Sequence, residues 1–116
     1  MIAFERADGR LIGFVEETLE LGEEIAIPAS ALAQAWRGGS RAARLVRLMT
    51  GSDIDPLDEV RARQVGERLG VRGRTDVVDA HVVCCAIERN AALVTSDPDD
   101  LEALADPSEN LVLVSV

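Results

Sequence analysis

Three aspartates occupy positions from which they could share one metal ion. Asp76 and Asp79 are three residues apart, so they lie on one face of a helical first turn, and Asp97 stands two residues after a short strand-like run. Two such carboxylates about 4 Å apart repel by about 4 kcal/mol at an effective dielectric constant of ~20. Mg²⁺ or Mn²⁺, which takes oxygen ligands, would relieve this repulsion. The alternative is that Asp76 and Asp97 are helix N-caps.

Four arginines recur at spacings of four, three and three residues: Arg37, Arg41, Arg44 and Arg47. If one helix continues through Gly38 and Gly39, this spacing predicts a single basic stripe. Planar guanidinium groups suit phosphate, so the stripe could hold a nucleic-acid backbone. The alternative is an ordinary solvated helix face.

The composition excludes several function classes. Twelve basic residues against 21 acidic ones give a formal net charge of −9, which excludes a protein that simply coats nucleic acid with positive charge. All the basic residues are arginine, so chemistry that needs a lysine, such as a Schiff base or a phosphate-loop lysine, is excluded. The chain has no tyrosine, so tyrosine acid–base roles are excluded as well.

The two cysteines and the apolar segments predict the compartment. Cys84 and Cys85 are adjacent, and neighbours in one helix point apart, so we expect reduced thiols in a cytoplasmic protein. The N-terminus lacks the apolar run of a signal peptide, and no segment is long enough to span a bilayer. We therefore expect a soluble protein with no membrane partner.

The elements that must position the candidate residues alternate between strand and helix patterns. Short β-branched runs predict strands at residues 25–27, 53–55, 92–95 and 111–114, and helix-period patterns fill the gaps between them. Capping signals predict helices over residues 58–69, closed by Gly70, and over 77–89, opened by Thr75 or Asp76. The 116 residues fit one domain, and the alternation favours a three-layer α/β/α fold around a mainly parallel sheet.

Two segments resemble the second half of a PIN-domain ribonuclease, and more narrowly the VapC-type toxins of bacterial toxin–antitoxin pairs. These segments are TDVVDAHVVCCA (75–86) and ALVTSDPDDL (92–101). The family pattern is an aspartate that opens a small-residue helix, then a strand ending in Thr-x-Asp, then a short helix. The segment IPASALAQAWR (27–37) resembles the family's second strand and the helix after it, so the resemblance spans nearly all of residues 1–116 as a single PIN-like domain.

The resemblance implies a metal-dependent endoribonuclease that a cognate antitoxin holds in check, and a homodimer. In the family, carboxylates bind Mg²⁺ or Mn²⁺, and the metal activates water for attack on an RNA phosphodiester. Asp79 matches the family's helix-opening aspartate, Asp97 matches its Thr-x-Asp aspartate, and Asp76 is an auxiliary acid seen in some members.

The sequence departs from the family pattern at two places. The family usually has a glutamate on the helix after the second strand, where this chain has Gln34. The family also begins with a central strand that ends in an aspartate. Residues 1–6 resemble the helix start that follows this strand, so we expect the first central strand and its aspartate to be missing, lying upstream of Met1.

Two other interpretations remain open. A catalytically impaired PIN-like module that dimerises and binds a partner would fit Gln34 and a missing strand. A phospho-acceptor receiver domain also has acids at strand ends, but it needs a lysine that this chain lacks. His81, two residues after Asp79, is predicted to be a partly exposed helix residue, and Trp36 to pack in the core or in a dimer interface.

Overall fold

A computed structural model describes the chain except residues 5–8, 37–42, 44–45, 48 and 116. Five parallel strands form one sheet in the order β3-β2-β1-β4-β5. The strands are β1 (Ile2–Phe4), β2 (Ile25–Pro28), β3 (Asp53–Asp55), β4 (Ala92–Thr95) and β5 (Val112–Ser115). The helices are α1 (Gly9–Glu20), α2 (Ala29–Ala35), α4 (Glu59–Arg72), α5 (Val77–Arg89) and α6 (Pro98–Glu102).

The central strand is present, so the expectation that it is missing was wrong. Ile2 of β1 pairs with Ile25 of β2 on one side and with Ala92 of β4 on the other. Ala3 is fully buried, and the amide of Ala92 donates to the carbonyl of Met1 at 3.0 Å. The strand has three residues, too few for local alternation to reveal, and its identity comes from backbone pairing on both sides.

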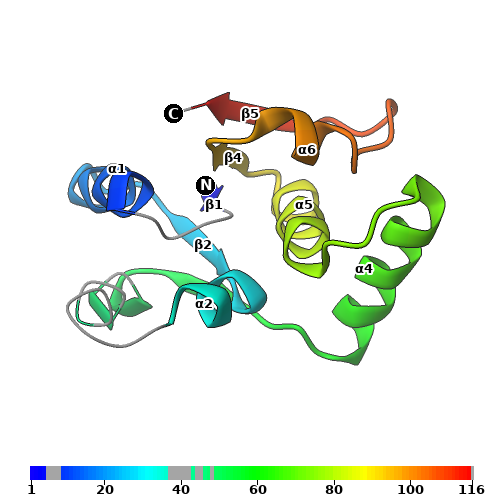
Figure 1. Cartoon of the computed structure of the whole chain (residues 1–116). Coiled ribbons are helices and arrows are strands. Elements are labelled where there is room, and N and C mark those ends of the chain that lie inside the picture. Colours follow the sequence, from blue (N-terminus) through cyan, green and yellow to red (C-terminus); the bar gives the residue numbers. More distant parts are fainter. Residues whose placement is uncertain (5–8, 37–42, 44–45, 48, 116) are drawn as a thin grey trace.

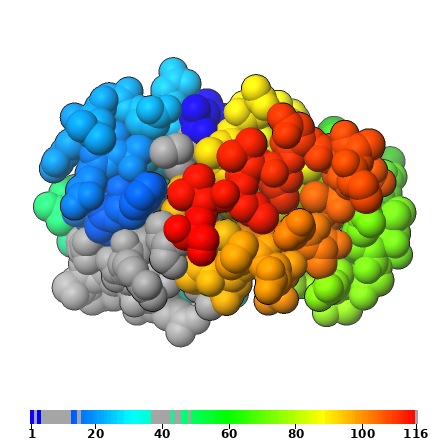
Figure 2. Space-filling view, turned by 90° about the horizontal axis from the view of Figure 1, so that it is seen from above, coloured from blue at the N-terminus to red at the C-terminus, as the bar shows by residue number. Residues whose placement is uncertain are grey.

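The sheet lies between α1 on one face and α5 on the other (Figure 1). This confirms the expected α/β architecture with helices on both sides of a parallel sheet. α5 is buried over most of its length, from Ala80 to Ala86, because the sheet covers one side of it and α4 packs on another. Seen from above, α6 and β5 lie across the middle of the molecule, between the α1 end and the α4 end (Figure 2).

Local signals in the sequence explain most helix boundaries. Asp58 caps α4 by accepting from the amide of Arg61 at 2.9 Å, and Asn90 ends α5 in the left-handed conformation at φ 53°. α4 does not end at Gly70 as expected. It continues to Arg72 and ends at Gly73, which adopts φ 63°, a conformation that glycine reaches without strain.

The remaining expectations fall partly outside the described residues. Of the helix expected over residues 41–49, the structure describes residues 43, 46–47 and 49, and all of these are helical. Within the part of the chain that is described, no helix is long and apolar enough to cross a membrane.

Candidate active site

The candidate acids lie at the carboxyl edge of the sheet, where parallel α/β proteins bind their ligands. α5 ends at Asn90, and Ala92 then begins β4 at the amino edge. A helix of 13 residues is about 20 Å long, so the first turn of α5 reaches the opposite edge. The contact between Ser30, which follows β2, and His81, in the second turn of α5, agrees with this placement.

Asp76 and Asp79 together build the start of α5. Asp76 is the N-cap, and its Oδ1 accepts from the amide of Asp79 at 3.0 Å. The N-cap interpretation of Asp76 is therefore confirmed, and this bond occupies one of its two carboxylate oxygens. Asp79 is half-buried in the first turn, where the positive end of the helix dipole favours a negative charge.

Asp97 stands at the end of β4, two residues after the buried Thr95. The hydroxyl of Thr95 accepts from the amide of Asp97 at 2.8 Å, which turns the chain out of the sheet. Asp97 precedes Pro98 at the start of α6, but its side chain makes no capping hydrogen bond there. Asp97 therefore occupies the N-cap position of α6, but its carboxylate does not cap the helix.

The donor chemistry suits a hard cation held mostly by water. Asp79 and Asp97 contribute carboxylates at the same edge of the sheet, and Mg²⁺ is commonly bound through one or two carboxylates while it keeps several waters. Among the described residues, no three His, Cys, Asp or Glu side chains gather into a group that could hold an ion. The trio of Asp76, Asp79 and Asp97 is therefore not brought together as a three-ligand cluster.

The other predicted site residues are only partly described. Gln34 is exposed on α2, the helix that follows the carboxyl end of β2. Arg37, Arg41 and Arg44 lie outside the described residues, and Arg47 is exposed in a helical stretch. The structure therefore describes one member of the expected basic stripe.

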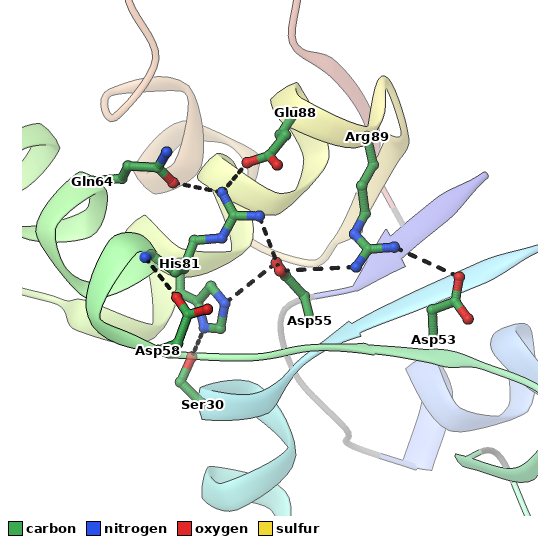
Figure 3. A network of polar contacts seen from close by, with 9 residues as sticks. Ser30, Asp53, Asp55, Asp58, Gln64, His81, Glu88 and Arg89 are labelled. Atoms are coloured by element: carbon green, nitrogen blue, oxygen red, sulfur yellow. Dashed lines mark hydrogen bonds and ion pairs between the residues drawn. The ribbon is translucent and has the colours of Figure 1, made fainter.

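A buried polar network beside this edge was not predicted (Figure 3). Asp55, at the carboxyl end of β3, is 1% exposed, and His81 is fully buried. Nδ1 of His81 lies 2.7 Å from the hydroxyl of Ser30, and its Nε2 lies 3.6 Å from Oδ2 of Asp55. The prediction that His81 is a partly exposed helix residue was wrong, because α2, β3 and α4 cover that side of α5.

Arg61 of α4 neutralises the carboxylate of Asp55. Its Nη2 donates to Oδ1 of Asp55 at 3.0 Å, and its Nη1 donates to Gln64 at 2.7 Å and to Glu88. Arg89 approaches the same Asp55 oxygen at 3.9 Å. With these cationic partners, Asp55 is a structural carboxylate and not a candidate metal ligand, although it ends a strand at the same edge.

Burial and the hydrogen bonds to nearby carboxylates shift the pKa values of the groups around Asp55. It lowers the pKa of His81, and the nearby charge of Arg61 adds to this effect against the opposing charge of Asp55. His81 is therefore neutral at neutral pH. Burial also raises the pKa of Cys85 to about 12, so Cys85 is a protonated thiol. For Arg61, burial opposes the charge, but hydrogen bonds to Glu88 and Asp55 outweigh it and raise the pKa.

A hollow apart from the candidate acids lies between α4, α5 and the loop before β5. Its volume is about 510 Å³, and its lining includes Arg68, Arg72, Cys84 and Glu109. Arg68 is held by both carboxylate oxygens of Glu109, at 2.6 and 2.8 Å, and Arg72 pairs with Asp106 at 3.1 Å. These guanidinium groups already have anionic partners, and no predicted site residue lines the hollow.

No protein-family model and no curated protein matches the chain. Solved structures share its fold, among them the following two. A chain in the crystal structure of VapBC2 from Rickettsia felis, bound to a DNA fragment from its promoter, superposes with a TM-score of 0.64 at 20% identity, covering 99% of this chain and 98% of that one. A chain in the structure of FitAB bound to the IR36 DNA fragment gives 0.65 at 14% identity, covering 99% and 94%. These matches confirm the expected PIN-like α/β fold over 99% of the chain.

Proposed function

We propose that this protein is a metal-dependent endoribonuclease of a toxin–antitoxin pair. The observation that carries the proposal is that Asp79 and Asp97 lie at one edge of a sheet whose fold is shared with chains of the VapBC2 and FitAB complexes. Ligands of open parallel sheets bind beyond this edge. Asp76 supports the site by capping the helix that carries Asp79.

Each residue has a defined task in this proposal. When bound, Mg²⁺ or Mn²⁺ would supply a nucleophile derived from water near neutral pH and would offset the charge that develops on the phosphate. Asp79 and Asp97 would hold that cation, and the Thr95 hydroxyl fixes the backbone that carries Asp97. Gln34 offers an amide oxygen without a charge where the resembled family has a glutamate, so it contributes less to cation affinity.

The partners follow from the same proposal. RNA is the substrate, and the exposed Arg47, together with Arg37, Arg41 and Arg44 of the same sequence pattern, binds its phosphates. A cognate antitoxin holds the enzyme inactive, a role supported by the likeness to chains from the VapBC2 and FitAB complexes. We further propose a homodimer, with the exposed Trp36 as a candidate contact.

RNA cleavage by the purified chain tests this function. With Mg²⁺ or Mn²⁺ present, we expect cleavage of structured RNA that stops on chelation and that Asp79→Asn abolishes. Asp100→Asn is the matched control, because Asp100 is an exposed aspartate of α6 close to Asp97 in the sequence. Cleavage that resists chelation, or that survives in Asp79→Asn, would contradict the proposal.

The second candidate function is a PIN-like module that binds a partner without cleaving RNA. Gln34 favours it, as does the lack of a three-ligand acidic group among the described residues. This candidate predicts a stable complex with the antitoxin and no cleavage of RNA with either metal. The cleavage assay therefore separates the two candidates directly.

A further inference from the structure

The buried contacts of His81 connect the two helices that carry candidate site residues. Ser30 belongs to the first turn of α2, and His81 belongs to α5. Asp55 and Arg61 tie this pair to β3 and α4 (Figure 3). One side chain from each of four elements therefore meets at a single buried point next to the carboxyl edge.

The partners of His81 define which ring nitrogen carries the proton. Nε2 lies 3.6 Å from Oδ2 of Asp55, and a carboxylate oxygen only accepts, which favours the tautomer that carries the hydrogen on Nε2. Nδ1 is then an acceptor for the Ser30 hydroxyl at 2.7 Å. Ser30 then donates to His81, Nε2 of His81 points toward Asp55 without reaching hydrogen-bond distance, and the other oxygen of Asp55 accepts from Arg61.

Burying these polar groups costs folding free energy, because some of their atoms make no hydrogen bond among the described residues. Oδ2 of Asp55 and Nε2 of His81 are buried without a hydrogen bond within the described part of the chain, since 3.6 Å separates them. Apolar side chains of similar volume often give equal or greater stability at such a place. Directional contacts, unlike apolar ones, fix the rotation and height of the helices that they join.

Helix geometry shows which side chains are oriented when the contact between Ser30 and His81 fixes the rotation of α2 and α5. Each residue of an α-helix turns by about 100°, so Asp79 projects roughly opposite His81 on α5. The contacts that hold His81 in place therefore also set the direction of Asp79. On α2, Ser30 and Gln34 are four residues apart and share one face. The bond between Ser30 and His81 thus fixes the rotation of α5 against α2, and with it the direction of Asp79.

We propose that Ser30, His81 and Asp55 are positioning residues, which lock α2 against the first two turns of α5 and thereby fix the direction in which Asp79 projects at the carboxyl edge. This inference rests on the proposed function, because it assigns a purpose to the lock only if that edge binds the metal. None of the three residues touches the metal or the RNA in this scheme.

Mn²⁺ binding by the full chain, measured by calorimetry, tests the lock. We expect Ser30→Ala to weaken Mn²⁺ affinity about tenfold, at the low end of the effect of residues that orient metal ligands, and Ser30→Thr, which restores the hydroxyl, to recover it. His81→Gln, which keeps a donor toward Asp55 but loses the Ser30 contact, should weaken affinity similarly.

The matched control is Thr18→Val on α1. The Thr18 hydroxyl is buried and donates to the carbonyl of Phe14 at 2.8 Å, so this variant also removes one hydroxyl hydrogen bond. It should leave Mn²⁺ affinity unchanged. In the metal-free chain, the backbone amide NMR signals of Gln34 and Asp79 should shift in Ser30→Ala and not in Thr18→Val.

The outcomes separate the lock from the proposed function. If the wild-type chain binds Mn²⁺ and Ser30→Ala binds it equally well, with unshifted amide signals, the lock is overturned and the proposed function stands. If the wild-type chain does not bind Mn²⁺, the proposed function is contradicted, and the lock falls with it because it has no ligand to position.

Discussion

At the scale of single residues, Asp76 caps α5, and a pair of substitutions separates this capping from any binding of metal. Its Oδ1 caps α5 through the amide of Asp79. Asp76→Ala removes this bond and should lower the free energy of unfolding by about 1 kcal/mol. Asp76→Asn keeps an oxygen that can cap the helix, so it should cost less. Urea unfolding of both variants measures the difference.

The same pair of variants tests whether Asp76 binds metal. Because one of its oxygens is already occupied by the cap, we expect Asp76→Asn to weaken Mn²⁺ affinity less than Asp97→Asn does. An equal loss in the two variants would show that Asp76 is a full ligand, and that capping is the lesser of its roles.

The residues that the sequence identified and those it missed differ in one physical respect. Asp76, Asp79 and Asp97 stand next to element boundaries, and capping and strand-end signals are local. Asp55, Arg61 and His81 meet only because β3, α4 and α5 converge in space. Nothing near His81 in the sequence indicates that a carboxylate 26 residues earlier will cover it.

At the scale of elements, Arg61 holds α4 against β3 and α5. It is the close cationic partner of Asp55, a buried carboxylate, at 3.0 Å. Arg61→Met keeps the length of the side chain but leaves that charge poorly compensated, which typically costs about 3–5 kcal/mol. We expect a loss of this size in denaturant unfolding.

The control for Arg61 lies on the same helix. Arg63 is exposed and pairs with Glu59 at 3.3 Å across one turn, and such pairs contribute only about 0–1 kcal/mol. Arg63→Met should therefore be nearly neutral. The double variant Arg61→Met with Asp55→Asn should regain part of the lost stability. Equal effects of Arg61→Met and Arg63→Met would refute the assigned role of the buried pair.

The sequence predicted most elements because their signals are local. Asp58 and Asn90 mark real helix ends, and four of the five strands were expected at nearly the observed residues. β1 was missed because three apolar residues carry no periodicity, and the strand exists through its pairing with β2 and β4. The end of α4 was misplaced because Gly70 and Gly73 are equivalent signals, and only the second adopts a left-handed conformation.

At the scale of the whole molecule, the charge of −9 opposes RNA binding. An acidic protein that binds RNA needs a local positive surface, and the exposed Arg47 belongs to the pattern that could supply it. We expect Arg47→Gln to weaken RNA binding and to reduce the slope of log affinity against log salt by about 0.7–1. Fluorescence anisotropy across a salt series measures both.

Arg63→Gln is the matched control for this experiment. It also removes one exposed arginine, so it produces the same change in net charge at a place outside the proposed stripe. Equal losses of RNA affinity in the two variants would indicate a response to overall charge and would contradict a localised RNA-binding surface.

The proposed function depends on binding of a divalent cation by Asp79 and Asp97 at the carboxyl edge of the sheet. Calorimetric titration of Mn²⁺ into the intact chain, beside Asp97→Asn, tests it most directly. We expect the wild-type chain to bind Mn²⁺ and Asp97→Asn to lose affinity by about tenfold or more. No binding by the wild-type chain, or unchanged affinity in Asp97→Asn, would contradict it.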